Sequence, residues 1–189
     1  MNTIKVFINK ILDKTIGYQL SRVDRSVYTF GYGENRPDLY KHIPNDLTGK
    51  MLDIGSAYGS WAQKKYGKDR VITFDQQGSA DVRGDIHHLP FPDQSFDVIF
   101  CFEVLEHVKE PWVAVNELHR VLKPSGVVYC STPFSHEIHG EEYGDYYRYT
   151  RQGLCHLFET VADFKDVKII SFGAHEKNPH HYLVIGNKK

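Results

Sequence analysis

A short loop of small residues follows an early apolar run and could hold a cofactor. Residues 51–60 read MLDIGSAYGS, with Asp53 two residues before the first glycine. A phosphate-binding loop needs a lysine at a set position after its glycines, and none stands there. A dinucleotide loop would accept Gly55, Ala57 and Ser60, but the Asp53 carboxylate disfavours a diphosphate. The stretch therefore favours a ligand that carries an ammonium group.

Two further acids stand where a nucleoside would need them. Asp75 ends the apolar run 70–75, where a carboxylate can accept hydrogen bonds from both hydroxyls of a ribose. Asp85 precedes an apolar patch, Leu89 to Phe91, so the acid could accept the exocyclic amine of an adenine while apolar groups cover the ring. These acids predict an adenosine-type cofactor.

The most polar and aromatic segment, residues 133–150, offers groups for a chemical step. It holds His136, His139, four acids, four tyrosines and Arg148, more than a connection between two elements requires. We expect His136 and His139 to act as a general base or to bind the acceptor, because a hydroxyl acceptor must lose a proton. A metal site would need a fixed ligand spacing, which the segment lacks, so no metal ligand is predicted.

Other residues of these types have structural alternatives. His107 either faces the reaction centre or packs inside and orients Glu103. In the segment 133–150, Asp145 and Arg148 could form a local ion pair, and Thr150 could cap the next helix. Structural roles are expected for the remaining histidines of note, which are His87, His88, His175, His180 and His181.

Alternating short apolar runs and helical patterns must position these groups. We predict strands at 51–56, 70–75, 96–102, 126–133, 167–173 and 181–187, and helices at 59–67, 110–122 and 150–162. This order indicates an α/β, Rossmann-like, doubly wound sheet with helices on both faces. The loops after its parallel strands meet at one edge, where ligands of such sheets bind.

Composition limits the class of protein. With 189 residues, 41% hydrophobic and 25% charged, the chain suits a globular protein with one main domain, at residues 46–189. A net charge of -1 gives no field for nucleic acid, and no apolar run is long enough to span a membrane. Three scattered cysteines suit buried thiols in a reducing cytoplasm.

The N-terminal residues 1–45 are predicted to form a helical extension that packs on the domain or on a second subunit. Lysines interrupt their apolar positions, so no signal peptide is predicted. A basic amphipathic helix can also lie on an anionic membrane surface, which stays an alternative. A homodimer is left open.

Five stretches in order, LDIGSAYG, FD, GDIHHLPFPDQSFDVI, EVLEHV and ELHRVLKPSGVVYCSTP, carry a family resemblance. The chain resembles the class I S-adenosylmethionine-dependent methyltransferases over residues 48–186, specifically the type 11-like, small-molecule branch. The resemblance implies a seven-stranded sheet, mostly parallel, in which the last strand runs antiparallel and inserts beside the fifth.

The resemblance also implies roles for individual residues. The methionine part of S-adenosylmethionine would lie along the first strand and its loop, the ribose hydroxyls would bind at the end of the second strand, adenine would bind in the next loop, and two residues after the fourth strand would flank the cofactor. In that order the residues are Asp53, Gly55, Ser56, Ala57 and Gly59; Asp75 and Gln76; Asp85 and Ile86; Phe102 and Glu103.

Two positions depart from the family pattern. Ala57 replaces a usual glycine, which costs about 1 kcal/mol or more if the position needs a positive φ and little otherwise. Gly144 stands where a proline is often seen.

The predicted function is methyl transfer from S-adenosylmethionine to a small polar acceptor, by O-methylation of a carbohydrate or another metabolite. A membrane-borne quinone or lipid-linked sugar stays an alternative acceptor. A nicotinamide-dependent (NAD(P)) oxidoreductase and a non-catalytic nucleoside-binding module remain alternative functions.

Overall fold

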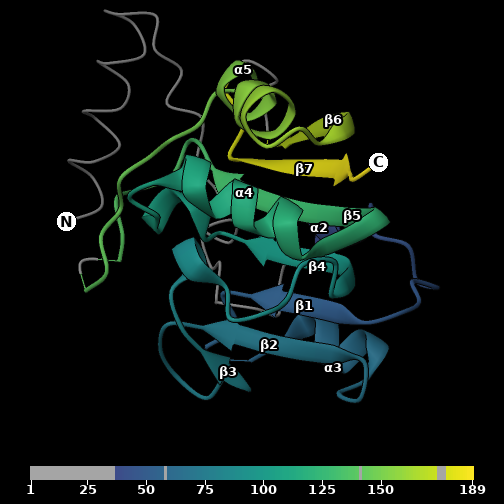
Figure 1. Ribbon diagram of the computed structural model, residues 1–189. Coiled ribbons are helices and arrows are strands. Elements are labelled where there is room, and N and C mark those ends of the chain that lie inside the picture. The colour runs from purple at the N-terminus through teal and green to yellow at the C-terminus, as the bar shows by residue number, and fades with distance from the viewer. Residues whose placement is uncertain (1–36, 58, 141, 174–177) are drawn as a thin grey trace, which may run out of the picture. The chain divides into compact units, whose positions relative to one another are not determined.

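The computed structural model describes residues 37–57, 59–140, 142–173 and 178–189 (Figure 1). Contacts divide the chain into two units, Met1–Gly31 and Tyr32–Lys189, and all described residues belong to the second. The predicted N-terminal extension, residues 1–45, lies outside the described residues as far as residue 36, so its packing stays a prediction. Within the described ranges, no helix has the length and apolar character needed to cross a membrane.

Seven strands form one sheet in the order β3-β2-β1-β4-β5-β7-β6. Their bounds are β1 Met51–Ile54, β2 Val71–Asp75, β3 Val82–Arg83, β4 Phe96–Phe102, β5 Leu122–Pro133, β6 Lys165–Phe172 and β7 His181–Asn187. The last strand, β7, lies between β5 and β6 and runs antiparallel to both. In Figure 1 its arrowhead points opposite to those of β1, β2 and β4. The predicted seven-stranded, mostly parallel sheet with an antiparallel last strand is confirmed.

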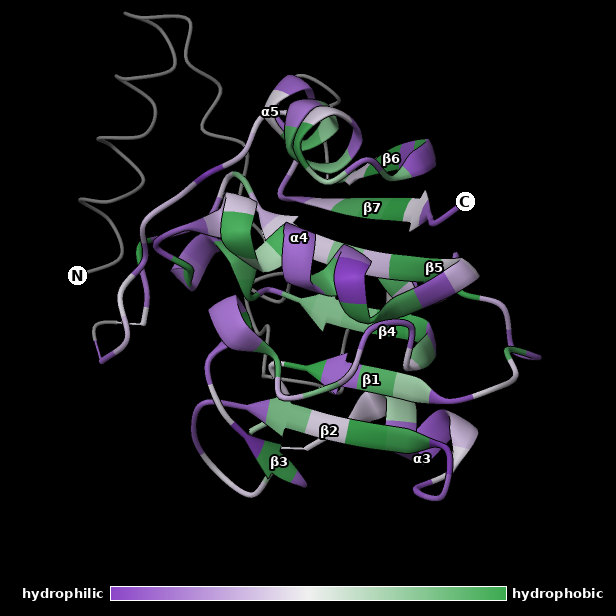
Figure 2. Cartoon of the chain, in the orientation of Figure 1, coloured by the Kyte–Doolittle hydropathy of each residue, from purple (hydrophilic) through white to green (hydrophobic). Residues whose placement is uncertain are grey.

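Successive residues of each buried strand point to opposite faces and so build two cores. In β4, Ile99 and Cys101 join the core under α4 (Pro111–Val121), α5 (Arg151–Cys155) and the π-helical turn η4 (His156–Val161). Val98 and Phe100 of the same strand join the core under α2 (Pro37–Tyr40) and α3 (Trp61–Tyr66). The strands are accordingly mostly hydrophobic along their length (Figure 2), as expected when both faces are covered.

Apart from short 3₁₀ helices and shifts of one or two residues at element ends, the structure differs from the predicted elements in three places. The short strand β3 was missed, because two residues leave no periodic pattern. The predicted helix 150–162 begins at Arg151 but changes from α-helical to π-helical at His156. The predicted strand 126–133 begins earlier, at Leu122, which pairs with Phe96.

Strand register brings the functional loops together. Ile54 at the end of β1 pairs with Phe74 of β2 and with Cys101 of β4. On the other side of β4, Phe102 pairs with Ser131 of β5. The loops that follow β1, β2, β4 and β5 therefore leave the sheet at a single edge.

Candidate functional site

The loop after β1 adopts a backbone that needs glycine at two positions but not at a third. Gly55 has a φ of +85° and Gly59 a φ of +133°, whereas Ala57 is not among the residues with positive φ. The Ala57 N–H donates to Asp75 Oδ2 at 3.0 Å, which ties the loop to the end of β2. A Cβ built at Gly78 would lie 2.8 Å from the Ala57 Cβ, so it is Gly78 that makes room for the alanine methyl group.

Asp53 is turned toward the loop that follows it. Its side chain is buried, and Ser60 Oγ donates to Asp53 Oδ2 at 2.5 Å. Ser60 also caps α3, because its Oγ accepts the Gln63 N–H at 2.8 Å. Burial raises the pKa of Asp53 to about 7, and the Ser60 hydrogen bond only partly opposes this rise. Asp53 therefore carries a carboxyl that changes its charge near neutral pH.

Asp75 organises two turns with one carboxylate. In addition to the Ala57 contact at Oδ2, its Oδ1 accepts the Gln77 N–H at 2.9 Å. A carboxylate offers about four lone-pair sites, so these two bonds leave acceptor capacity for a ligand. Asp75 is thus fixed in place and still able to accept hydroxyl donors.

Asp85 caps the short 3₁₀ helix η2, Ile86–His88, with one of its two oxygens. Its Oδ1 accepts the His87 N–H at 2.9 Å and lies 2.5 Å from His87 Nδ1. Burial alone would raise the pKa of Asp85, but the His87 hydrogen bonds and charge outweigh it and lower the pKa. Oδ2 makes no hydrogen bond to another described residue, so this charged oxygen is the one available to an amine.

One cavity joins Asp75 and Asp85 to the end of β4. Its empty space, including the open solvent at its mouth, is about 810 Å³. Apolar side chains, among them Phe74 and Ile86, line the wall beside the carboxylates. Of the predicted site residues, those that line the cavity are Gly55, Ala57, Asp75, Gln76, Asp85, Ile86, Glu103 and His107; those that do not are Asp53, Ser56, Gly59, Phe102, His136 and His139.

The lining fits the cofactor that the resemblance implies. An apolar wall beside an available Asp85 oxygen suits an adenine, and the Asp75 carboxylate suits ribose hydroxyls. Phe102 does not line this cavity, because its ring packs on the opposite face of the sheet, 6.1 Å from the Tyr40 ring centroid.

Glu103 sits in a left-handed conformation at the end of β4 and binds two residues of other strands. Its φ is +53°. Ser131 Oγ donates to Glu103 Oε1 at 2.6 Å, and His181 Nδ1 lies 3.0 Å from Oε2. Glu103 thus lines the cavity while its carboxylate anchors β5 and β7.

His181, for which the sequence predicted only a structural role, lies at the ligand edge of the sheet. Because β7 is antiparallel, its first residue lies at the edge where the parallel strands end, and His181 pairs with Pro133 at the end of β5. Its buried imidazole reaches Glu103 beside the cavity. The sequence predicted an antiparallel last strand, and this direction alone would have placed His181 at the ligand edge.

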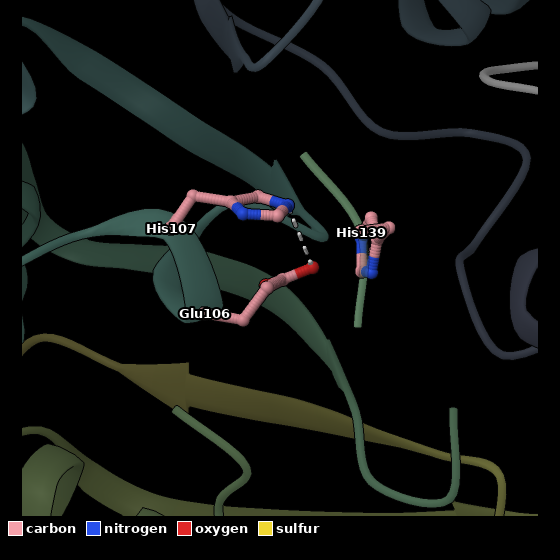
Figure 3. A group of neighbouring side chains, drawn as sticks. All are labelled: Glu106, His107 and His139. Carbon is pink, nitrogen blue, oxygen red and sulfur yellow. Dashed lines mark ion pairs between the residues drawn. The ribbon is translucent and has the colours of Figure 1, made fainter. Parts of the chain in front are cut away.

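Figure 3 shows Glu106, His107 and His139 gathered at the short 3₁₀ helix η3, Leu105–His107. His107 Nδ1 lies 2.5 Å from the Gly144 carbonyl oxygen, to which it donates, so Nε2 carries the lone pair. Nε2 lies 3.7 Å from Oε1 of the fully buried Glu106. Burial, opposed by the Gly144 hydrogen bond, lowers the pKa of His107, so its imidazole is neutral at pH 7.

The segment 133–150 is fastened to the same helix by hydrogen bonds. The Glu106 carbonyl accepts the N–H groups of Tyr146 and Tyr147 at 2.7 and 3.2 Å. The Tyr149 hydroxyl donates to the Leu105 carbonyl at 2.9 Å. Gly144 has a φ of +92°, which the proline often seen at this position cannot adopt. The departure from the family pattern therefore changes the path of this backbone.

The structural alternative for three residues of the segment is confirmed. Arg148 forms a bidentate ion pair with Asp145, and the Thr150 Oγ1 accepts the Gly153 N–H at 3.1 Å as the cap of α5. Burial would raise the pKa of Asp145, but Arg148 and the His139 N–H lower it to about 2. Asp145 also accepts that N–H at 2.9 Å, so the ion pair positions His139.

The two predicted bases form a row with other imidazoles. The ring centroid of His139 lies 4.8 Å from that of His107 and 5.0 Å from that of His136. The row continues to His181, 6.0 Å from His136. His136 and His139 are partly buried rather than fully exposed, but of the imidazoles in this row only His107 lines the cavity.

Comparison with known proteins identifies the family. Residues 29–130 match the family described as "Methyltransferase domain". The 27-O-demethylrifamycin SV methyltransferase of Amycolatopsis mediterranei is 26% identical, covering 66% of this chain and 44% of its own. The demethylmenaquinone methyltransferase of Lysinibacillus sphaericus is 28% identical, covering 67% of this chain and 61% of its own.

A solved methyltransferase structure has a similar fold. The crystal structure of a SAM-dependent methyltransferase from Archaeoglobus fulgidus has a TM-score of 0.64 at 17% identity, covering 80% of this chain and 91% of the other. This chain spans between 25% and 61% of the length of the curated relatives. The family match covers more than half of the chain and agrees with the sheet order and the cavity. The chain therefore belongs to the class I S-adenosylmethionine-dependent methyltransferases.

Proposed function

We propose that this chain transfers a methyl group from S-adenosylmethionine to an oxygen of a small polar acceptor. The observation that carries the proposal is the cavity, which runs from Asp75 and Asp85 at one end to His107 and Tyr143 at the other. The acids proposed to bind a nucleoside and the His107 imidazole thus line one space.

On the cofactor side, the proposed contacts use groups that are already fixed. Asp75 would hold the ribose, Asp85 and Ile86 the adenine, and the loop 55–59 the methionine part, with Asp53 behind it. S-adenosylmethionine supplies an electrophilic methyl group on its sulfonium sulfur. In methyl transfer, the acceptor oxygen attacks the methyl carbon in line with the departing sulfur. Holding the two reactants in that alignment provides much of the acceleration.

On the acceptor side, His107 is the best-placed general base. Its Nδ1 proton is committed to the Gly144 carbonyl, and its low pKa leaves Nε2 able to accept a proton at pH 7. His139 and His136 follow in the row of imidazoles and could bind the acceptor or take the proton onward.

The proposed acceptor is a hydroxylated metabolite, such as a carbohydrate, because imidazoles and tyrosines gather at this end of the site. A relative that is named for demethylmenaquinone keeps a quinone as a second candidate acceptor. The oxidoreductase alternative is disfavoured because a carboxylate at Asp53, directly before the loop, repels a diphosphate.

Calorimetric titration with S-adenosylmethionine, S-adenosylhomocysteine and NADH tests the cofactor. We expect binding of the first two, and a loss of roughly 10- to 100-fold in affinity for Asp75→Ala, since charge-assisted hydrogen bonds contribute about 1.5 to 3 kcal/mol. Asp166→Asn, at an exposed acid of β6, is the control. Binding of NADH alone would refute the proposal.

Transfer is tested with cofactor labelled on the methyl group and a pooled extract of polar metabolites. The expected result is a labelled product that is stable to base, as ethers are. A protein that binds the cofactor but labels nothing in polar or lipid extracts would be a nucleoside-binding module instead.

A further inference from the structure

We propose that Glu106, His107 and His139 bind a divalent first-row transition-metal cation, to which the acceptor oxygen then coordinates. The cation site itself stands on these three side chains. Only its role toward the acceptor rests on the proposed function. The sequence predicted no metal because the third ligand comes from a different loop than the first two.

The three side chains supply the ligand types and nearly the spacing of a metal site. One ligand atom from each residue lies within 4.8 Å of the others. Ligands bound to one tetrahedral cation at about 2.1 Å lie about 3.4 Å apart, so the widest separation in the set must contract by up to about 1.4 Å. Two imidazoles and one carboxylate are a common donor set for zinc, iron and manganese, with coordination positions left open.

The second nitrogen of each imidazole is already engaged, as it is in metal-binding histidines. His107 Nδ1 donates to the Gly144 carbonyl at 2.5 Å. His139 Nδ1 lies 3.1 Å from the Glu137 carbonyl oxygen and 3.3 Å from Asp145 Oδ2. These contacts fix the tautomer and leave Nε2 of both rings with its lone pair.

Burial adds an electrostatic reason. Glu106 is fully buried, and a carboxylate in such a place is costly unless positive charge compensates it. Arg148 interacts electrostatically with Glu106, but its guanidinium is also engaged by Asp145 in a bidentate pair. A divalent cation held by Glu106, His107 and His139 would supply positive charge directly.

The cation sharpens the acceptor class to a molecule with an oxygen donor, best with two adjacent ones that can chelate. A coordinated hydroxyl has a lowered pKa and loses its proton to His136, the imidazole next in the row. Its oxygen then forms a bond to the methyl carbon as the carbon–sulfur bond breaks, and the thioether leaves. When the cation is bound, His107 is a metal ligand, and His136 takes over the role of general base.

Cation binding is measured on the whole chain, without cofactor or acceptor, so that its result is independent of methyl transfer. After treatment with a chelator and its removal, Mn²⁺ is titrated and followed by electron paramagnetic resonance, and Zn²⁺ by calorimetry. We expect one site per chain. His139→Gln and Glu106→Gln should each weaken binding by at least tenfold.

His156→Gln, at an exposed histidine of the π-helical turn η4, is the matched control and should bind as the wild type does. Since Glu106 is buried and its variant could unfold, His139→Gln, with a side chain 29% exposed, carries the test alone if needed. Equal binding by wild type and His139→Gln, or no binding by wild type, would overturn the proposal. A chain that binds the cation but transfers no methyl group would instead count against the proposed function.

Discussion

The two ends of the cavity are built in different ways. At the cofactor end, carboxylates at strand ends accept backbone N–H groups that are close in sequence, as Asp75 does from Gln77 and Asp85 from His87. At the acceptor end, the contacts join distant segments, since His107 meets Gly144 and Glu103 meets His181. The cofactor end is therefore shaped mainly by hydrogen bonds between residues close in sequence, and the acceptor end by contacts between segments far apart in the chain.

This difference indicates which end tolerates variation. A nucleoside needs the same backbone donors and carboxylates whatever the acceptor is, and these follow directly from strand ends. The acceptor end depends on a segment, 133–150, that is fastened mainly to η3 and can change its path by one residue such as Gly144. Variants that separate the two ends can break or sharpen this comparison.

The largest effect is expected from Gly55→Ala, which strikes the cofactor end. The position has a φ of +85°, and an added Cβ would lie 2.3 Å from Val104 Cγ2. Strain and overlap together should cost about 1 to 3 kcal/mol of stability and weaken cofactor binding more than tenfold. Denaturant unfolding measures the loss of stability, and calorimetry measures the loss of cofactor affinity.

Gly59→Ala is the matched control, because its φ is +133° but nothing lies within 4 Å of the added Cβ. It carries strain without overlap and should cost less. Equal losses in the two variants would mean that contact with Val104 contributes nothing.

The next effect is a pH dependence from Asp53. Its pKa is about 7 in the fold and 3.8 as the ordinary value, so between these pH values the folded chain holds a proton that the unfolded chain has released. Stability should therefore fall as the pH rises from about 4 to about 7, by at most about 1.4 kcal/mol per pH unit, and level off above.

Denaturant unfolding curves measured between about pH 4 and pH 7 test this pH dependence of stability. The Asp53→Asn variant is expected to lose the part of the dependence that comes from Asp53. Ser60→Ala removes the hydrogen bond that opposes the burial effect and should extend the fall to higher pH. An unchanged slope in Asp53→Asn would contradict the assignment.

A smaller effect is expected from Tyr149→Phe at the acceptor end. The change removes the hydroxyl that donates to the Leu105 carbonyl at 2.9 Å and should cost about 1 kcal/mol of unfolding free energy. Cofactor affinity should stay within about twofold, because the cofactor end makes no use of this bond.

Tyr147→Phe removes a more exposed bond, to the Lys109 carbonyl at 2.9 Å, and serves as the control with a smaller cost. A large loss of cofactor affinity in Tyr149→Phe would show that the two ends are coupled.

The smallest effect is expected from Ala57→Gly. Since Ala57 does not have a positive φ, restoring the usual glycine relieves no strain and only adds freedom to the unfolded chain. Stability should fall by about 0.4 to 1 kcal/mol, with cofactor affinity unchanged within threefold. A tenfold gain in affinity would mean that the alanine methyl group obstructs the cofactor.

The sequence by itself determined the sheet and most of the cofactor end. Apolar runs of strand length that end in an acid or in a glycine loop can be recognised locally, because hydrogen bonds such as Gln77 N–H to Asp75 and His87 N–H to Asp85 join residues close in sequence. The spacing also indicated His107, although not which of its nitrogens is free. Local signals were too weak for β3 and for the change to π-helix at His156.

Only the tertiary structure decided the acceptor end. Register and the antiparallel direction of β7 bring His181 to Glu103, and the path of the 133–150 segment brings His139 to Glu106 and His107. Contacts between residues so far apart in the chain have no period or spacing in the sequence. The charge state of Asp53 is likewise a property of burial, which exists only once the helices cover the sheet.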